Sequence, residues 1–386
     1  MFTPRARAMV ALAAIASSTL LAAGCGSSES DGSPDTTAAV SAAEPSGVSL
    51  KGVCPDTVVI QTDWFATPER AAAYQLVGPG GSVDTSKGAY TGPLGDTGVN
   101  LEVRFGGSFI GFTPIPQQMY TDKSIMLGLV ATDDAVAAAE KFPTMAVVAP
   151  LDLNPQTITF DPDTYDISSW DDVAKTDATI IYIEGLPFMD YLVSKGYVDE
   201  DQLDPSFDGT PSRFIADDGK TITQEYGTND YRWEHDYPGW EKPVKSLLVN
   251  DSGYQIYPQG YAVRSDELSK DSACLKELVP LIQQAQIDYV KDPKATNDEI
   301  IEISEEIMEG PTFTPEGNEA ATKAMLDLEI VGNGTNDVFG DFDEDRVADT
   351  IEILKPIYAA RDQDVPTDLK PEDLVTNEFI DDSIKL

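Results

Sequence analysis

The sequence predicts an α/β protein built from two lobes. Short runs of β-branched and other apolar residues alternate with helix-like segments along most of the chain. This alternation is typical of sheets that are covered by helices. The folded part begins near residue 51, so roughly 335 residues remain, which is more than a single hydrophobic core usually serves.

The clearest element is a strand, turn and helix that begins at residue 58. Residues 58–60 form an unbroken β-branched run, and Pro68 fits the first position of a helix over residues 71–77. Asp63 and Trp64 lie between them, at the carboxyl end of the strand, where open α/β sheets bind ligands. An acid beside a large aromatic indicates a site that holds a small molecule by charge and stacking. The alternative is a helix-capping Asp beside a core Trp.

Two further strands end in residues suited to a ligand site. Residues 99–105 alternate as a strand before a glycine pair, and residues 125–130 read as a buried strand before a helix. The candidates at these ends are Gly107, Ser108, Thr132 and Asp133. Glycines let backbone N–H groups approach a ligand, although an ordinary turn explains them equally well, and helix capping could explain the last two residues.

A second set of elements follows residue 161. A capped helix start at residues 169–173 precedes a strand over residues 179–183, which ends in Glu184. After a helix over residues 187–194, further strands are predicted at residues 244–249 and 261–263. The remaining chain is predicted to be helical at residues 275–290, 298–308, 316–328 and 346–360, with Pro280 and Pro356 expected to kink or delimit the first and last of these helices.

The N-terminus predicts export. Residues 1–24 have a charged start, a short apolar stretch and small residues before Cys25, which resembles the lipobox of bacterial lipoproteins. By that resemblance Cys25 carries lipid, including palmitate, and residues 25–50 form a flexible tether. In an oxidising compartment, Cys54 and Cys274 are then a candidate disulfide worth about 4–5 kcal/mol, or else two unconnected buried thiols.

Composition excludes several functions. A net charge of −41 repels phosphate backbones, so we expect no nucleic-acid binding. No Cys/His cluster exists, and an acidic run beginning at Asp341 has Arg346 where a calcium loop requires Gly. We therefore predict no metal and no cofactor. His235 is the only histidine, and we expect it to lie on the surface.

The order of elements, the lipobox and three stretches resemble the solute-binding lipoproteins of bacterial ABC importers. The stretches are residues 62–65, 128–133 and 257–264, and the similarity is greatest to the nitrate/sulfonate/taurine and thiamine-pyrimidine-precursor group. The resemblance implies a two-lobed, type II periplasmic-binding-protein fold with two crossover segments. Lobe one would comprise residues 51–152 plus 255–386, and lobe two residues 153–254.

The resemblance also implies one cleft that collects the candidate residues, with Tyr254 added. In it Trp64 would stack on the ligand, while Asp63, Asp133 and Glu184 would accept hydrogen bonds from amines. No facing arginine is evident, which argues against an anion. We expect a monomeric, lipid-anchored, extracytoplasmic binding protein that delivers a small amine-bearing or heteroaromatic solute to ABC permease subunits. The alternatives are an enzyme on the same fold, similar to a pyrimidine synthase, and a surface lipoprotein that recognises another protein.

Overall fold

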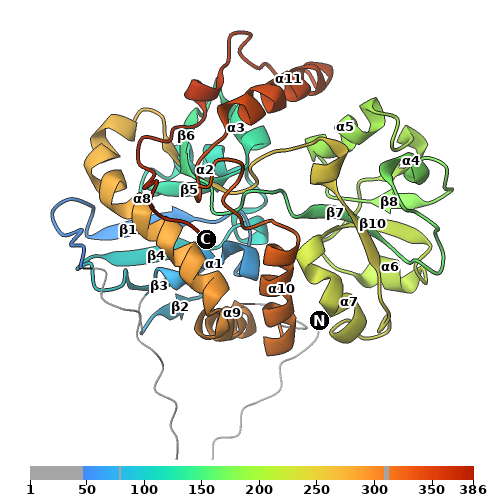
Figure 1. Cartoon of the computed structure of the whole chain (residues 1–386), viewed down its shortest axis with the longest axis horizontal. Coiled ribbons are helices and arrows are strands. Elements are labelled where there is room, and N and C mark those ends of the chain that lie inside the picture. Colours follow the sequence, from blue (N-terminus) through green and yellow to red (C-terminus); the bar gives the residue numbers. More distant parts are fainter. Residues whose placement is uncertain (1–46, 78–79, 308–312) are drawn as a thin grey trace, which may run out of the picture. The chain divides into compact units, whose positions relative to one another are not determined.

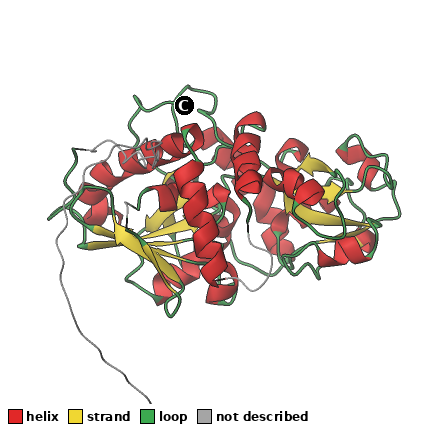
Figure 2. Ribbon diagram, turned by 90° about the horizontal axis from the view of Figure 1, so that it is seen from below, coloured by secondary structure: helices red, strands yellow, loops and turns green. Residues whose placement is uncertain are grey.

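A computed structural model describes residues 47–77, 80–307 and 313–386. It contains two β-sheets, each with helices packed against it (Figure 1; Figure 2). The predicted signal at residues 1–24, the lipidation site Cys25 and most of the predicted tether lie outside the described residues. Among the described helices, none combines the length and the apolar character needed to cross a membrane.

The first sheet has seven strands in the order β2-β3-β4-β1-β5-β12-β6. Their bounds are β1 Thr57–Gln61, β2 Ser82–Asp84, β3 Ala89–Pro93, β4 Asn100–Arg104, β5 Leu127–Val130, β6 Thr144–Val148 and β12 Gly260–Arg264. Strand β1 pairs in parallel with β4 and β5, whereas β12 is antiparallel to β5 and β6. The parallel centre places the carboxyl ends of β1, β4 and β5 at one edge of this sheet.

The second sheet has five strands in the order β11-β7-β10-β8-β9. Their bounds are β7 Gln156–Phe160, β8 Thr179–Ile181, β9 Leu203–Asp204, β10 Thr221–Tyr226 and β11 Lys245–Leu248. Strand β10 pairs in parallel with β8 and antiparallel with β7. In the sequence, all five strands of this sheet lie between β6 and β12. The chain therefore crosses from the first sheet to the second and back.

The described residues contain eleven α-helices. Their bounds are α1 Ala71–Gln75, α2 Ile115–Thr121, α3 Thr132–Ala138, α4 Trp170–Val173, α5 Pro187–Ser194, α6 Ser212–Ala216, α7 Asp230–His235, α8 Leu268–Lys291, α9 Lys294–Ile307, α10 Pro315–Asp327 and α11 Glu344–Ala360. Eight of the eleven lie where helices were predicted, whereas α2, α6 and α7 were not predicted. Pro280 and Pro356 lie inside α8 and α11 and delimit neither helix. Each removes one backbone donor, and packing of the long helix outweighs that loss.

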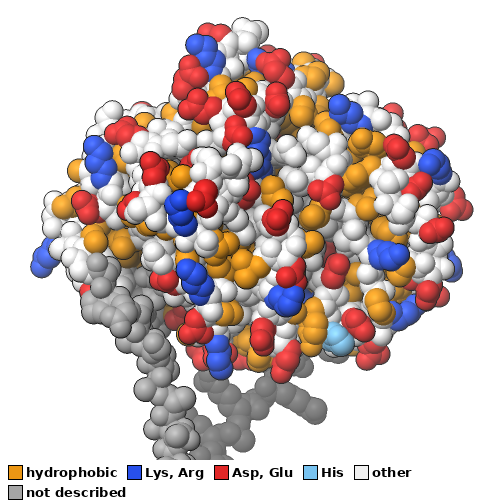
Figure 3. All heavy atoms as spheres, in the orientation of Figure 1, with side chains coloured by type: hydrophobic (Ala, Val, Ile, Leu, Met, Phe, Trp, Pro, Cys, Tyr) orange, Lys and Arg blue, Asp and Glu red, His pale blue; other side chains and the backbone are white. Residues whose placement is uncertain are grey.

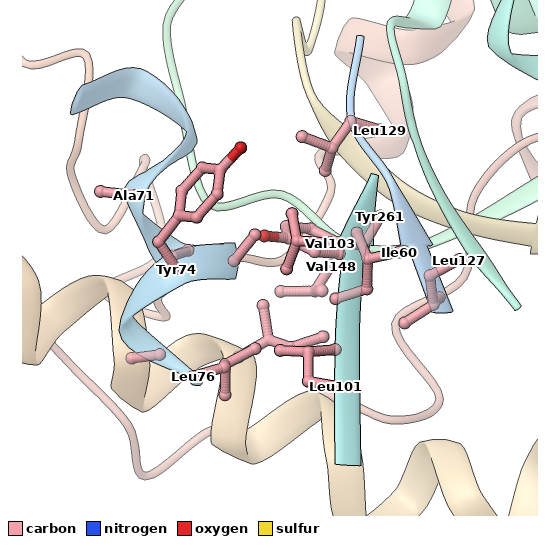
Figure 4. Packing of buried hydrophobic residues seen from close by; sticks show 14 of the residues in the cluster. Ile60, Ala71, Tyr74, Leu76, Leu101, Val103, Leu127, Leu129, Val148 and Tyr261 are labelled. Atoms are coloured by element: carbon pink, nitrogen blue, oxygen red, sulfur yellow. The ribbon is translucent and has the colours of Figure 1, made fainter. Parts of the chain in front are cut away.

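The core of the first sheet explains why β1 is the strand most easily predicted from the sequence. Ile60 is fully buried, and Figure 4 shows it among Leu101, Leu127 and the side chains of α1. From α1, Tyr74 and the neighbouring Leu76 extend toward the sheet in the same cluster. Because β1 is covered on both faces, its central residues 58–60 are all apolar instead of alternating. Replacing Ile60 by Ala would cost about 2–5 kcal/mol.

A disulfide joins Cys54, just before β1, to Cys274 on α8. Their Cα atoms lie 4.8 Å apart, although 220 positions separate the two residues in the sequence. The pair confirms the predicted disulfide. It fixes the start of the first sheet to the long helix that contacts α1.

Candidate functional site

A cavity of about 520 Å³ lies between residues that follow strands of the two sheets. The first sheet contributes residues after β1, β4 and β5, and the second contributes residues at or after β8 and β10. Those used below are Asp63, Trp64, Glu69, Arg70, Gly107, Phe112, Asp133, Asp134, Glu184, Glu225, Tyr226, Arg232, Tyr237 and Phe313. Its volume suits a small molecule that carries a ring.

Five of the eight predicted ligand residues line this cavity, namely Asp63, Trp64, Gly107, Asp133 and Glu184. The other three do not. Ser108 is exposed outside the cavity, and Thr132 is buried against the backbone of Tyr257. Tyr254 is 1% exposed and lies behind Asp133, so its ring is not free to stack on a ligand. Its place in the core follows from packing against Phe188 and Tyr191.

Trp64 is half-buried on the cavity wall. Gly107 has a φ of +59°, and a Cβ atom there would lie 2.8 Å from Cε3 of the indole. Any larger residue at that position would displace the ring as well as strain the backbone. The ring of Phe112, which is 61% exposed, lies 5.9 Å from the indole between centroids. Together the two rings form an aromatic wall that sequence reasoning found only in part.

Asp63 is paired with Arg70, which corrects the expectation that its carboxylate is free for a ligand amine. Arg70 Nε donates to Asp63 Oδ1 at 2.8 Å, and Nη2 donates to Oδ2 at 2.5 Å. The guanidinium is 3% exposed, and although burial opposes it, the Asp63 charge raises the arginine pKa. Arg70 also reaches the hydroxyl of Tyr226 on β10 at 3.5 Å. Asp63 therefore helps to join the two sheets.

Asp133 and Asp134 begin helix α3 and face the same cavity. Asp133 Oδ2 accepts a hydrogen bond from Tyr254 Oη at 2.9 Å; burial nevertheless raises its pKa. The Asp134 carboxylate is open to the cavity and forms no side-chain hydrogen bond with another described residue. Desolvation, with the charges of Asp133 and Asp63, raises the pKa of Asp134 to about 7. This carboxyl was not predicted, although it is adjacent to one that was.

Three further carboxyl groups face the cavity. Glu184 is exposed and makes no ion pair with any described residue. Glu69 is 3% exposed and accepts a hydrogen bond from Thr228, which follows strand β10 of the second sheet. Glu225 accepts one from Asn229 Nδ2 at 2.8 Å, and burial raises its pKa. These residues belong to different elements, so their convergence depends on the fold.

Six acidic residues thus face two arginines in the cavity. The expectation that no arginine faces the ligand is wrong, because both Arg70 and Arg232 line the cavity. Arg70 is neutralised by Asp63, however, so the excess of carboxyl groups remains. An aromatic wall together with uncompensated carboxylates favours a cationic ring compound. Within the described residues no cluster of His, Cys, Asp or Glu is arranged to hold a metal ion.

Solved structures share this architecture. The periplasmic aliphatic sulphonate-binding protein SsuA from Escherichia coli aligns at 12% identity and a TM-score of 0.55, covering 84% of this chain and 92% of that one. The alkanesulfonate-binding protein SsuA from Xanthomonas axonopodis pv. citri, bound to MOPS, aligns at 10% identity and 0.53, covering 83% and 98%. The chain has the two-lobed fold of periplasmic binding proteins. This confirms the predicted fold class.

The sequence comparisons add nothing to this. No protein-family model matches the chain, and no curated protein sequence matches it. A structure from Bordetella bronchiseptica RB50 shares the fold at 13% identity and a TM-score of 0.53, covering 84% of this chain and 96% of that chain. At such identities the likeness extends to the fold and not to the residues of the cavity.

Proposed function

We propose that the protein is the extracytoplasmic solute-binding component of an ABC importer and that its solute is a small aromatic or heteroaromatic amine. The fold supports the first part, because the structures it resembles are named as sulphonate-binding proteins. The lobes would comprise residues 51–152 plus 255–386 and residues 153–254, and solute would be captured as they close.

The observation that carries the ligand class is the excess of carboxyl groups over arginines beside Trp64. A sulphonate placed here would meet Asp134 and Glu184, neither of which has a positive partner among the described residues. An ammonium group would instead compensate them, while the attached ring stacks on the indole. We therefore favour an amine, although the sulphonate-binding structures share the fold.

Native mass spectrometry of the purified protein tests whether a small molecule is retained, and calorimetry with benzylamine and with benzenesulfonate tests its charge. We expect benzylamine to bind and benzenesulfonate not to bind. Asp134→Asn should weaken benzylamine binding about tenfold, since it removes one uncompensated carboxylate. The matched control is Asp171→Asn on α4, which is exposed and lies outside the cavity. Tight binding of the sulphonate alone would contradict the proposal.

The predicted lipid anchor belongs to the same proposal. Lipidation at Cys25 would hold the binding protein near its permease at the extracytoplasmic face of the membrane. The sequence motif supports this, since Cys25 follows a charged start, an apolar stretch and small residues. Cys25→Ser should move the protein from the membrane fraction to the soluble fraction. Equal membrane association of both forms would contradict lipidation at this residue.

A further inference from the structure

The guanidinium of Arg232 on α7 lines the ligand cavity, and no described residue accepts a hydrogen bond from it. Its side chain is only 12% exposed, and its Nε atom is buried with no acceptor. It forms no side-chain hydrogen bond with any residue of the described ranges. A buried N–H group of a charged side chain is costly to leave unpaired, so an acceptor on the ligand would stabilise it here.

Two aromatic rings lie within cation–π distance of this guanidinium. Its Cζ atom lies 4.5 Å from the ring centroid of Phe313 and 4.9 Å from that of Tyr237. Both rings also line the cavity. Both contacts are cation–π interactions, and they restrict the position of the guanidinium beside the cavity. The side chain is therefore held ready to donate hydrogen bonds to a group in the cavity.

The charges around Arg232 decide which kind of acceptor it receives. Asp236 Oδ2 lies 4.0 Å from Nε, and its carboxylate already accepts a hydrogen bond from Thr314 Oγ1 at 2.8 Å. Glu225 and Glu69 line the same cavity. Burial raises the pKa of Glu225, and the charge of Arg232 acts in the opposite direction, so the two charges interact. Asp236, Glu225 and Glu69 already compensate the positive charge of Arg232. A ligand carboxylate placed here would add a further, uncompensated negative charge.

We propose that Arg232 donates hydrogen bonds to an uncharged oxygen acceptor of the solute, such as an amide or ring carbonyl. The inference rests on the proposed function and narrows it. The solute is then an aromatic amine that also carries a carbonyl oxygen, with its cationic group toward Asp134 and Glu184 and its oxygen toward Arg232. A neutral oxygen satisfies the donors without adding charge, which a carboxylate does not.

A matched ligand series tests this by calorimetry at pH 7.5. The probes are benzylamine, 4-(aminomethyl)benzamide and 4-(aminomethyl)benzoate, with the 3-substituted isomers of the last two. We expect the benzamide in at least one isomer to bind about tenfold more tightly than benzylamine, as one hydrogen bond to a charged group provides. The benzoate should bind no more tightly than the benzamide.

Arg232→Met keeps the apolar stem of the side chain and removes its donors. It should abolish the tenfold gain of the benzamide over benzylamine, measured as the ratio of the two affinities within the same variant. The control is Arg213→Met on α6, an arginine outside the cavity. The inference is overturned if the gain persists in Arg232→Met, if benzamide and benzylamine bind equally, or if the benzoate binds best. The wild-type comparison stays decisive if the variant does not fold. If benzylamine itself does not bind to the wild-type protein, that result would instead contradict the proposed function.

Discussion

Binding of a cation in this cavity should weaken as the pH falls from 8 to 6. Desolvation, together with the charges of Asp133 and Asp63, raises the pKa of Asp134 to about 7. A bound ammonium group favours the ionised carboxylate. The affinity for the cation is therefore highest above this pKa and decreases as the pH falls through it. At low pH, binding releases one proton from the carboxyl group.

The size of the effect follows from one titrating group. At pH 8 nearly all Asp134 is ionised, and at pH 6 about one molecule in eleven is, so Kd should rise about tenfold over this range. Tenfold is the upper limit for Asp134 alone, since this carboxyl is open to the cavity and solvent there offsets part of its desolvation. Benzylamine suits the measurement because an aliphatic amine stays protonated over the whole interval.

Calorimetry in two buffers of different ionisation enthalpy measures both the affinity and the protons exchanged. At pH 7 we expect release of about half a proton per benzylamine bound. Asp134→Asn should bind more weakly at pH 8 and show a flat profile, whereas Asp171→Asn should retain the wild-type profile. A wild-type Kd that stays constant within about twofold between pH 6 and pH 8, with no proton release, would refute the assignment.

Three other changes test the remaining parts of the site. Asp63→Asn removes two charge-assisted hydrogen bonds from Arg70, which is 3% exposed, and leaves Glu69, at 3.9 Å, as its nearest carboxylate. It should lower the free energy of unfolding by about 2–3 kcal/mol in urea titration, and a loss below about 1 kcal/mol would contradict a structural ion pair. Replacing Cys54 and Cys274 by Ser should lower it by about 4–5 kcal/mol, given the 220-residue separation, and an unchanged urea midpoint would count against the crosslink. Trp64→Leu should weaken benzylamine about 30-fold through lost cation–π contact, whereas unaltered binding would remove the indole from the site.

The predictable part of the fold is the part encoded locally. Strands β1 and β5 were found because they are short apolar runs buried on both faces. Strand β10 was missed, although it joins β7 and β8 at the centre of the second sheet. Its sequence, Thr221–Tyr226, is largely polar, and its burial results from the neighbouring strands instead of its own hydrophobicity.

The residues of the candidate site also divide into those that the local sequence predicts and those whose position depends on the fold. Asp63, Trp64 and Glu184 were predictable because each directly follows an apolar strand, and the carboxyl ends of strands meet at a cleft. Arg232 lies in a polar segment that was expected at the surface, where His235 is indeed exposed and visible in Figure 3. Its position depends on Phe313, which is distant in sequence and contacts it only in the folded chain.

The acids of this protein separate into two groups with different roles. Figure 3 shows Asp and Glu side chains scattered over one face without gathering in a single patch, as expected of a solvated, strongly acidic surface. The carboxyl groups in the cavity are instead brought together from both sheets, and hydrogen bonds such as that from Thr228 to Glu69 hold them there. These carboxyl groups repel one another across the cavity until a cation compensates their charge. Compensation of these carboxyl groups would therefore favour binding of the proposed cationic solute, because Arg70 and Arg232 together supply too little positive charge to neutralise six acidic residues.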